Sequence, residues 1–508
     1  MKMKFRARAR ALTGFCAAGL AVVAGNAQAE IAISSAATQN MSCTAGMCTP
    51  TAAKAVLNVG DLETLLASGN VSVETAGNGV QAASIKVSAG LTWSSTHVLT
   101  LDAWRSILIG NAVSVTGTGG LSVKTNDGGN GGALSFGGKG NVTFQSLSSS
   151  LSINGLSYTL VNSVAGLANA VSQNQDGNVA LAGDYNAGGD GTYAQSPVSL
   201  IYGGAFEGLG HTIANLSIAD TNNSDYVGLF YEISPGGAVA DLNMSGVNIN
   251  SPTVSLAGAI AGDNQGTIVN ARSSGTVIGG QFGGGGVAGF NFGTIAGSSS
   301  SASVQGANVG GLIGFNEAAI INAHATGNVV AVTGPNSPIG GGLVGENQGT
   351  VETSWASGSV SGSDDSSELG GLIGSLDSGT LNDAYSTGAV TAGTNALVGG
   401  AVGYAGVGVG TSYSTGAPSG GAYSFVGGYA GYDDSAGGMK HDCWDMTTSG
   451  ITDSSQGAGN LANDPGIKGL TTRKLQSQLP KGFSAKIWAE DANINGGLPY
   501  LRANPPGR

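Results

Sequence analysis

The chain has 508 residues, of which 90 are glycine, 10% are charged and 6% are aromatic. This composition is unfavourable for the core of a globular enzyme, and glycine does not recur at every third position as collagen requires. The 31 acidic residues outnumber the 19 basic residues, which argues against nucleic acid or an anionic membrane as a partner.

The first 29 residues have the three parts of a secretory signal peptide. Five basic residues precede an apolar run at 11–24, and Ala27-Gln28-Ala29 fits the small-x-small rule, so we expect cleavage before Glu30. The apolar run is too short to span a bilayer comfortably, which disfavours a membrane anchor. The mature chain is therefore expected outside the cell or at its surface, with the periplasm as the alternative.

Residues 30–55 are small, polar and without a repeating pattern, which predicts a flexible N-terminal lead. This segment holds Cys43 and Cys48, whose spacing suits a small disulfide loop in an oxidising compartment. Metal binding is the alternative for this pair, but no histidine or second cysteine pair supports it. Cys443 is left over, and it is either buried or paired with another chain.

Residues 56–160 form short runs that alternate apolar and polar residues, separated by Gly or Asn. This pattern predicts the coils of a β-helix. The next segment, 161–250, opens with helix-like spacing at 161–171 and continues as degenerate coils. The last segment, 447–508, changes in composition and includes a predicted short helix, so we expect a C-terminal cap over the last coil.

Residues 251–446 form a glycine-rich repeat array. A repeat of about 28 residues indicates stacked units, and so an all-β solenoid. Each repeat has a glycine after an aliphatic pair, which we interpret as a structural turn with positive φ. Four repeats place an asparagine two residues later, where stacked amides can hydrogen-bond from one coil to the next. The glycines are Gly262, Gly289, Gly314, Gly345, Gly374, Gly403 and Gly431, and the asparagines are Asn264, Asn291, Asn316 and Asn347.

Several stretches of the chain are similar to known families. The stretch GGLVGENQGTVETSWASGSVSG, at 341–362, resembles the GLUG motif of large bacterial surface and secreted proteins. Upstream, LLASGNVSVET and GAFEGLGHTIANLSI resemble the body of filamentous haemagglutinin-like adhesins. The resemblance covers nearly all of 56–505, and it implies a right-handed parallel β-helix that acts in adhesion. We recognise no secretion domain of the kind with which such exoproteins begin, so the resemblance implies no route across an outer membrane.

One column of the repeat stands ten or eleven residues after the glycine and is rich in aromatic, His and Arg side chains. If exposed, such a ladder can stack on sugar rings and hydrogen-bond their hydroxyls. We favour the other interpretation, a structural column that is half-buried at the edge of each coil, because the resemblance implies that this position is often aromatic and serves packing. The column also includes Ser299, and its candidate binding residues are Arg272, His324, Trp355, Tyr385, Tyr413 and His441.

Parallel β-helices also include polysaccharide lyases and hydrolases, which need acids and bases clustered on one face. Here the aspartates fall mainly in predicted turns with few basic neighbours, so turn formation explains them better. We expect no catalytic residue, no metal site and no cofactor.

The sequence therefore predicts a secreted or surface-exposed β-solenoid that is not an enzyme. We interpret it as an adhesin that binds a cell-surface glycan or protein through many weak contacts, with no transmembrane segment after signal cleavage. Two alternatives stay open, namely a carbohydrate-active β-helix enzyme and a self-associating matrix or surface-layer component.

Overall fold

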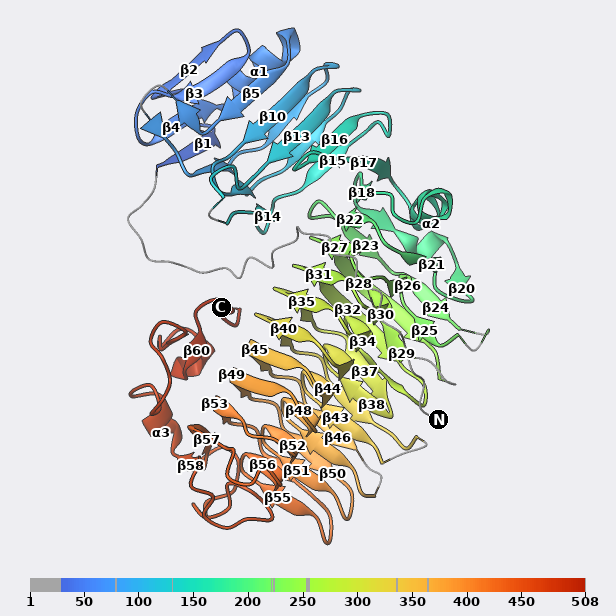
Figure 1. Cartoon of the computed structure of the whole chain (residues 1–508), viewed down its shortest axis with the longest axis vertical. Helices are drawn as coiled ribbons and strands as arrows, with labels where there is room; N and C mark the ends of the chain where they lie inside the picture. The colour runs from blue at the N-terminus through green and yellow to red at the C-terminus, as the bar shows by residue number, and fades with distance from the viewer. Residues whose placement is uncertain are drawn as a thin grey trace.

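The computed structural model describes residues 29–77, 80–129, 131–220, 222, 224–252, 256–334, 337–362 and 365–507. The chain folds as a parallel β-solenoid of about 15 turns with few helices (Figure 1), which confirms the predicted fold class. The predicted signal peptide, 1–29, lies outside the described residues apart from Ala29.

The solenoid begins at Glu30, so the prediction of a flexible lead over 30–55 is wrong. Ile31 and Ile33 are fully buried, because alternate side chains of a strand point to the same face. This alternation involves only two inward residues and is too short to be recognised in the sequence. The strand joins a five-stranded sheet made of β1 (Glu30–Ser34), β4 (Ala55–Asn58), β8 (Ser84–Val87), β11 (Ile107–Ile109) and β14 (Leu134–Phe136).

The same N-terminal segment contains the predicted disulfide. Strands β2 (Met41–Thr44) and β3 (Met47–Pro50) form an antiparallel hairpin in which Cys43 lies opposite Cys48, and the two sulfurs are bonded. A helix that the sequence analysis did not predict, α1 (Val59–Ser68), follows β4 and buries Leu62 and Leu66 in the first core. A second small sheet completes these coils with β9 (Leu91–Trp93), β12 (Val113–Val115) and β15 (Val142–Phe144).

The two halves of the solenoid share one long sheet, while their other sheets are separate. The halves meet where β16 (Ser150–Ile153) turns back into β17 (Leu156–Val161) as an antiparallel pair. Helix α2 (Val164–Gln173) follows, close to the predicted 161–171, and buries one apolar face in the second core. Residues 161–250 are more regular than expected, because strands after α2 already stack in register with those of the repeat array.

Each coil of the second half contributes to the long sheet and to two further sheets. One of these has nine described strands, β21 (Val198–Tyr202), β26 (Phe230–Ile233), β30 (Ala261–Asn264), β34 (Ala288–Asn291), β39 (Ile313–Asn316), β44 (Val344–Asn347), β48 (Ile373–Leu376), β52 (Val402–Ala405) and β56 (Ala430–Asp433). The other has eight, β25 (Tyr226–Val227), β29 (Leu256–Gly258), β33 (Gly283–Gly285), β38 (Asn308–Gly310), β43 (Ile339–Gly341), β47 (Glu368–Gly370), β51 (Leu397–Gly399) and β55 (Phe425–Gly427).

The seven repeat glycines lie inside strands of the nine-stranded sheet, so their interpretation as turns with positive φ is wrong. None of the seven has a positive φ. They are glycines because another backbone passes too close for a side chain. A Cβ on Gly345 would lie 2.6 Å from the carbonyl oxygen of Gly314 and 2.9 Å from the backbone nitrogen of Val309, both on the preceding coil.

The left-handed residues occur elsewhere in the coil, between two strands of the long sheet, at a bend within one of its strands or, at His441, directly before one. The residues there have φ between 48° and 64°, and most are short polar residues, which tolerate this conformation better than bulky ones. They are Asp241, Asn270, Asn322, Thr353, Asp383, Thr411 and His441.

The asparagine column forms the predicted ladder of amides. Each Nδ2 donates to the Oδ1 of the next asparagine over 2.7 Å, from Asn264 through Asn291 and Asn316 to Asn347. All four side chains are fully buried, so the ladder satisfies polar groups that water does not reach. In the next two coils, the residues in register with Asn347 are Leu376 and then Ala405. An apolar residue therefore fits the same position once the ladder has ended.

We predict that Asn316→Leu destabilises the fold more than Asn264→Leu. The first substitution removes a middle member that both donates and accepts, so Asn291 Nδ2 loses one acceptor and the buried Asn347 Oδ1 loses its donor. The second removes a terminal member whose Oδ1 has no partner among the described residues. An unsatisfied buried amide costs about 1–3 kcal/mol, so the two midpoints of chemical denaturation should differ measurably. Equal midpoints would contradict a role for the ladder in stability.

Candidate functional site

The column proposed as a binding ladder follows one line of the long sheet. Parallel register aligns Arg272 with Ser299, then His324, Trp355, Tyr385 and Tyr413 in successive coils. The next residue in register is Cys443, so the prediction that His441 belongs to the column is wrong. These residues lie on β32 (Arg272–Ile278), β36 (Ser299–Ser300), β41 (His324–Ala325), β45 (Thr350–Ala356), β49 (Thr380–Ser386), β53 (Gly410–Ser414) and β57 (Asp442–Asp445).

The aromatic part of the column is a continuous stack. The rings of His324 and Trp355 are 4.4 Å apart and 2° from parallel. The next pairs, Trp355 with Tyr385 and Tyr385 with Tyr413, have centroid distances of 5.8 Å and 5.1 Å. Neighbouring strands of a sheet are about 4.8 Å apart, so a ring in each successive coil is brought into stacking contact with the next.

The C-terminal residues cover this stack. After the last long-sheet strand, β58 (Ile467–Leu470), the chain forms a one-turn helix, α3 (Thr472–Leu475), and then runs back beside β53, β49 and β45 (Figure 1). We call residues 471–507 the C-terminal strap. Its Leu475, Phe483, Trp488 and Leu501 pack with Trp355, Tyr385, Tyr413 and Cys443 in one buried cluster.

The prediction of a terminal cap is therefore only partly correct. Residues 447–470 complete the last coil, whereas the strap covers a side of the solenoid. The structural interpretation of the column is correct for Trp355, Tyr385 and Tyr413, which are at most 4% exposed, and the exposed ladder is wrong for them. Outward aromatic rings are costly to leave in water, and the apolar residues of the strap shield them.

Hydrogen bonds fix the strap on the column. Trp355 Nε1 donates to the carbonyl of Asn504 over 2.9 Å, and Tyr413 Oη donates to the carbonyl of Pro499 over 2.6 Å. Asn504 Nδ2 donates to the carbonyls of Ala323 and Thr353, so the end of the strap is held by two coils. This pattern indicates a structural role for the covered half of the column.

The two unusual residues at the end of the column are also accounted for. Cys443 is 2% exposed within the cluster, and burial raises the pKa of its thiol, so it is not placed to pair with another chain. His441 is exposed in a left-handed turn before β57, beside Gly482 of the strap.

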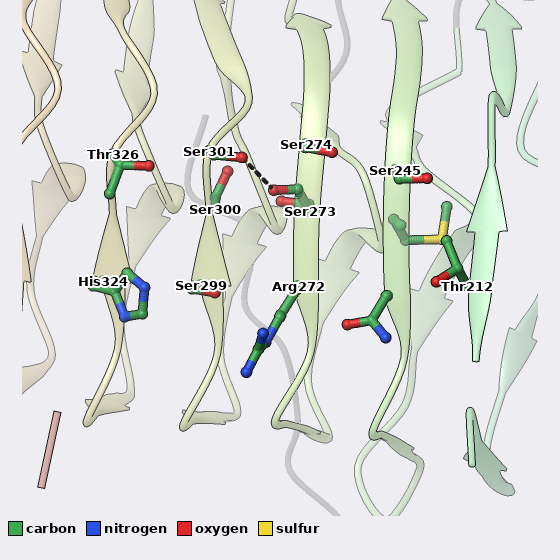
Figure 2. Close-up of a pocket in the computed structure, with 12 residues that line it drawn as sticks. Thr212, Ser245, Arg272, Ser273, Ser274, Ser299, Ser300, Ser301, His324 and Thr326 are labelled. Atoms are coloured by element: carbon green, nitrogen blue, oxygen red, sulfur yellow. Dashed lines mark hydrogen bonds between the residues drawn. The ribbon is translucent and has the colours of Figure 1, made fainter. Parts of the chain in front are cut away.

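The other half of the column is open. Beyond the end of the strap, a groove of about 240 Å³ crosses β28 (Asn243–Asn250), β32, β36 and β41. Figure 2 shows two rows of side chains along it, one with Arg272, Ser299 and His324 and one with Ser245, Ser274, Ser301 and Thr326. We call this the polar groove. The remaining lining residues are Thr212, Asn243, Met244, Ser273 and Ser300.

The charge of the polar groove differs from that of the chain. Of the described residues that line it, none is Asp or Glu, although acidic residues outnumber basic ones in the whole chain. Arg272 is exposed, and within the described part of the chain its guanidinium has no ion pair. Burial, together with the charge of Arg272, lowers the pKa of His324, so this ring is neutral at pH 7. Its Nδ1 donates to Asn504 Oδ1 over 3.0 Å, which places the end of the strap at one end of the groove.

Sequence reasoning missed most of the groove, because scattered serines resemble turn residues. The available signal was the repeat itself, since Ser274, Ser301 and Thr326 each follow a column member by two residues, which is the spacing of one strand face. Across the described residues, no group of three or more His, Cys, Asp or Glu side chains is arranged to hold a metal ion.

The comparisons with known proteins agree with the architecture. Residues 305–330 match the GLUG motif. A stretch of 82 residues is 37% identical to halomucin from Haloquadratum walsbyi (strain DSM 16790 / HBSQ001), and it spans 16% of this chain and 1% of that protein. This chain is therefore a β-solenoid that carries the GLUG motif, while its resemblance to filamentous haemagglutinin-like adhesins stays a prediction. None of the helices in the described residues is long and apolar enough to cross a membrane.

We predict opposite responses from two tyrosines of the column. Tyr413→Phe removes a buried hydroxyl that donates to Pro499 and accepts from Asn495, so it should destabilise the fold by about 1–3 kcal/mol. Tyr385→Phe removes a buried hydroxyl that has no partner among the described residues, so it should be neutral or stabilising. The free energy of unfolding from urea titration measures both. A loss in Tyr385→Phe as large as in Tyr413→Phe would contradict this account of the strap.

Proposed function

We propose that this protein is an exported, non-enzymatic adhesin that binds a glycan of a host or neighbouring cell along the polar groove. The observation that carries the proposal is the open half of the column. There, two rows of side chains, which carry hydroxyl groups and one arginine, cross neighbouring strands of the sheet, and each coil contributes to the rows. Rows of this kind suit an extended polyol, whose own hydroxyl groups recur along its length.

The composition of the groove supports binding rather than catalysis. Glycoside hydrolysis uses a pair of carboxyl groups beside the scissile bond, and the described lining of the groove contains none. Several of the described aspartates that the sequence places near one another accept local hydrogen bonds. Asp442, for example, accepts hydrogen bonds from Ser412 and from the backbone of Lys440.

The match to the GLUG motif and to a short part of halomucin supports placement outside the cell, as does the basic, apolar and small-residue pattern at 1–29. The resemblance to haemagglutinin-like adhesins supports a role in attachment. A single shallow groove binds weakly, so firm attachment would depend on many copies of the chain engaging one surface.

The test compares two variants of the mature chain that differ only in where a bulky ring stands. Ser301→Trp places the ring in the groove, whereas Ser303→Trp places it two residues along the same coil, at an exposed position outside the groove. We expect wild type and Ser303→Trp to bind glycan arrays and intact cells, and Ser301→Trp to lose that binding while its melting temperature is unchanged. Binding that survives in a folded Ser301→Trp protein would exclude the groove as the site.

A further inference from the structure

We infer that the polar groove selects a carboxylate-bearing polysaccharide, a polymer that contains uronic acid, with Arg272 as the ligand of the carboxylate. This inference rests on the proposed glycan-binding function and adds the class of glycan. It depends on three features of the groove's described residues, namely a single cation that forms no ion pair, hydroxyl groups without a hydrogen-bond partner, and a low density of positive charge.

The first feature is the position of Arg272. A surface arginine in an acidic chain would ordinarily be expected near a carboxylate, yet within the described residues no ion pair forms here and no acidic side chain lines the groove. The guanidinium is exposed at the groove and is free to bind a ligand. Its planar fork matches a carboxylate, which it binds through two parallel hydrogen bonds.

The second feature is the set of hydroxyl groups around Arg272. Within the described structure, the hydroxyls of Ser245, Ser299 and Thr326 make no hydrogen bond to protein. The backbone groups beside them are already paired within the sheet, so these hydroxyls are available to a ligand. Hydroxyl groups both donate and accept, as the hydroxyls of a sugar do. The row of Ser245, Ser274, Ser301 and Thr326 places one hydroxyl on each coil, about 4.8 Å apart, which matches an extended chain that lies along the solenoid axis.

The third feature separates a uronic acid polymer from a densely sulfated one. Among the described residues that line the groove, Arg272 is the one fixed positive charge, because burial and the charge of Arg272 lower the pKa of the neighbouring His324 and favour its neutral form. A polymer with several sulfates on each repeat would bring anions against hydroxyls and amides that cannot neutralise them. A polymer with one carboxylate per sugar and several hydroxyls fits one guanidinium among serines better.

The experiment uses the full mature chain and two forms of one ligand. A long oligogalacturonate carries the carboxylates, and its methyl ester has the same sugar chain without the charge. Arg272→Gln removes the charge from the groove, and Arg272→Lys keeps the charge without the fork. The matched control is Arg473→Gln, which makes the same change in net charge on the exposed surface of α3, outside the groove. Dextran sulfate and dextran form the sulfated and neutral arms.

We expect wild type and Arg473→Gln to bind oligogalacturonate about tenfold or more tightly than its ester, because a charge-assisted hydrogen bond differs from a neutral one by roughly this factor. Arg272→Gln should bind the acid and the ester equally, with the affinity that wild type has for the ester. The affinity of Arg272→Lys for the acid should lie between those of wild type and Arg272→Gln. Calorimetric titration measures each affinity, and circular dichroism checks the fold.

The other outcomes separate the two proposals. If wild type binds the ester as well as the acid, and Ser301→Trp abolishes both, the glycan-binding function stands and the selection of carboxylates is wrong. If Arg272→Gln retains the preference for the acid, Arg272 is not the carboxylate ligand. Tighter binding of dextran sulfate, lost in Arg272→Gln, would assign the groove to sulfate esters instead. If no glycan binds to any variant, the proposed function itself is overturned.

Discussion

The structure depends on one constraint, which is that each coil must lie on the coil before it in parallel register, about 4.8 Å away. Every position therefore has to be compatible with the residues above and below it in its own column. At Gly345 the constraint leaves no room for a Cβ, because the backbone of the preceding coil occupies that space. At Asn316 it leaves room for an amide but no water, and the column is filled by residues that hydrogen-bond to one another.

The same constraint acts on the outer face, where it produces a different result. A column on the surface has no opposing sheet, so its residues are free to vary, and this column changes from Arg and Ser to His, Trp and Tyr along its length. Where the column becomes aromatic, stacking and the strap turn it into a second small core. Where it stays polar, it remains open. One line of the sheet therefore serves as core in one region and as candidate site in another.

The repeat was the part of the fold that could be predicted from sequence, because a recurring spacing survives even when individual residues change. The amide ladder followed from it, since four asparagines at the same place in successive coils must meet. The reason for the glycines could not be predicted, because close approach of a neighbouring backbone and a left-handed turn both select glycine. The covering of Trp355 and Tyr413 by residues 471–507 could not be predicted either, because it joins segments more than 80 residues apart with no shared pattern.

The position of the strap's end has a consequence for the candidate site. Asn504 binds His324 on one side and Trp355 on the other, at the boundary where the column changes from polar to aromatic. The strap thus holds the ring of His324 in place by its Nδ1 and keeps the apolar rings away from solvent, so the open groove contains few apolar side chains. A sugar in this groove would be recognised through hydrogen bonds and charge rather than through stacking on aromatic rings. Specificity would then depend on Arg272, which the column in the sequence indicates, and on the neighbouring row of hydroxyl groups, which it does not.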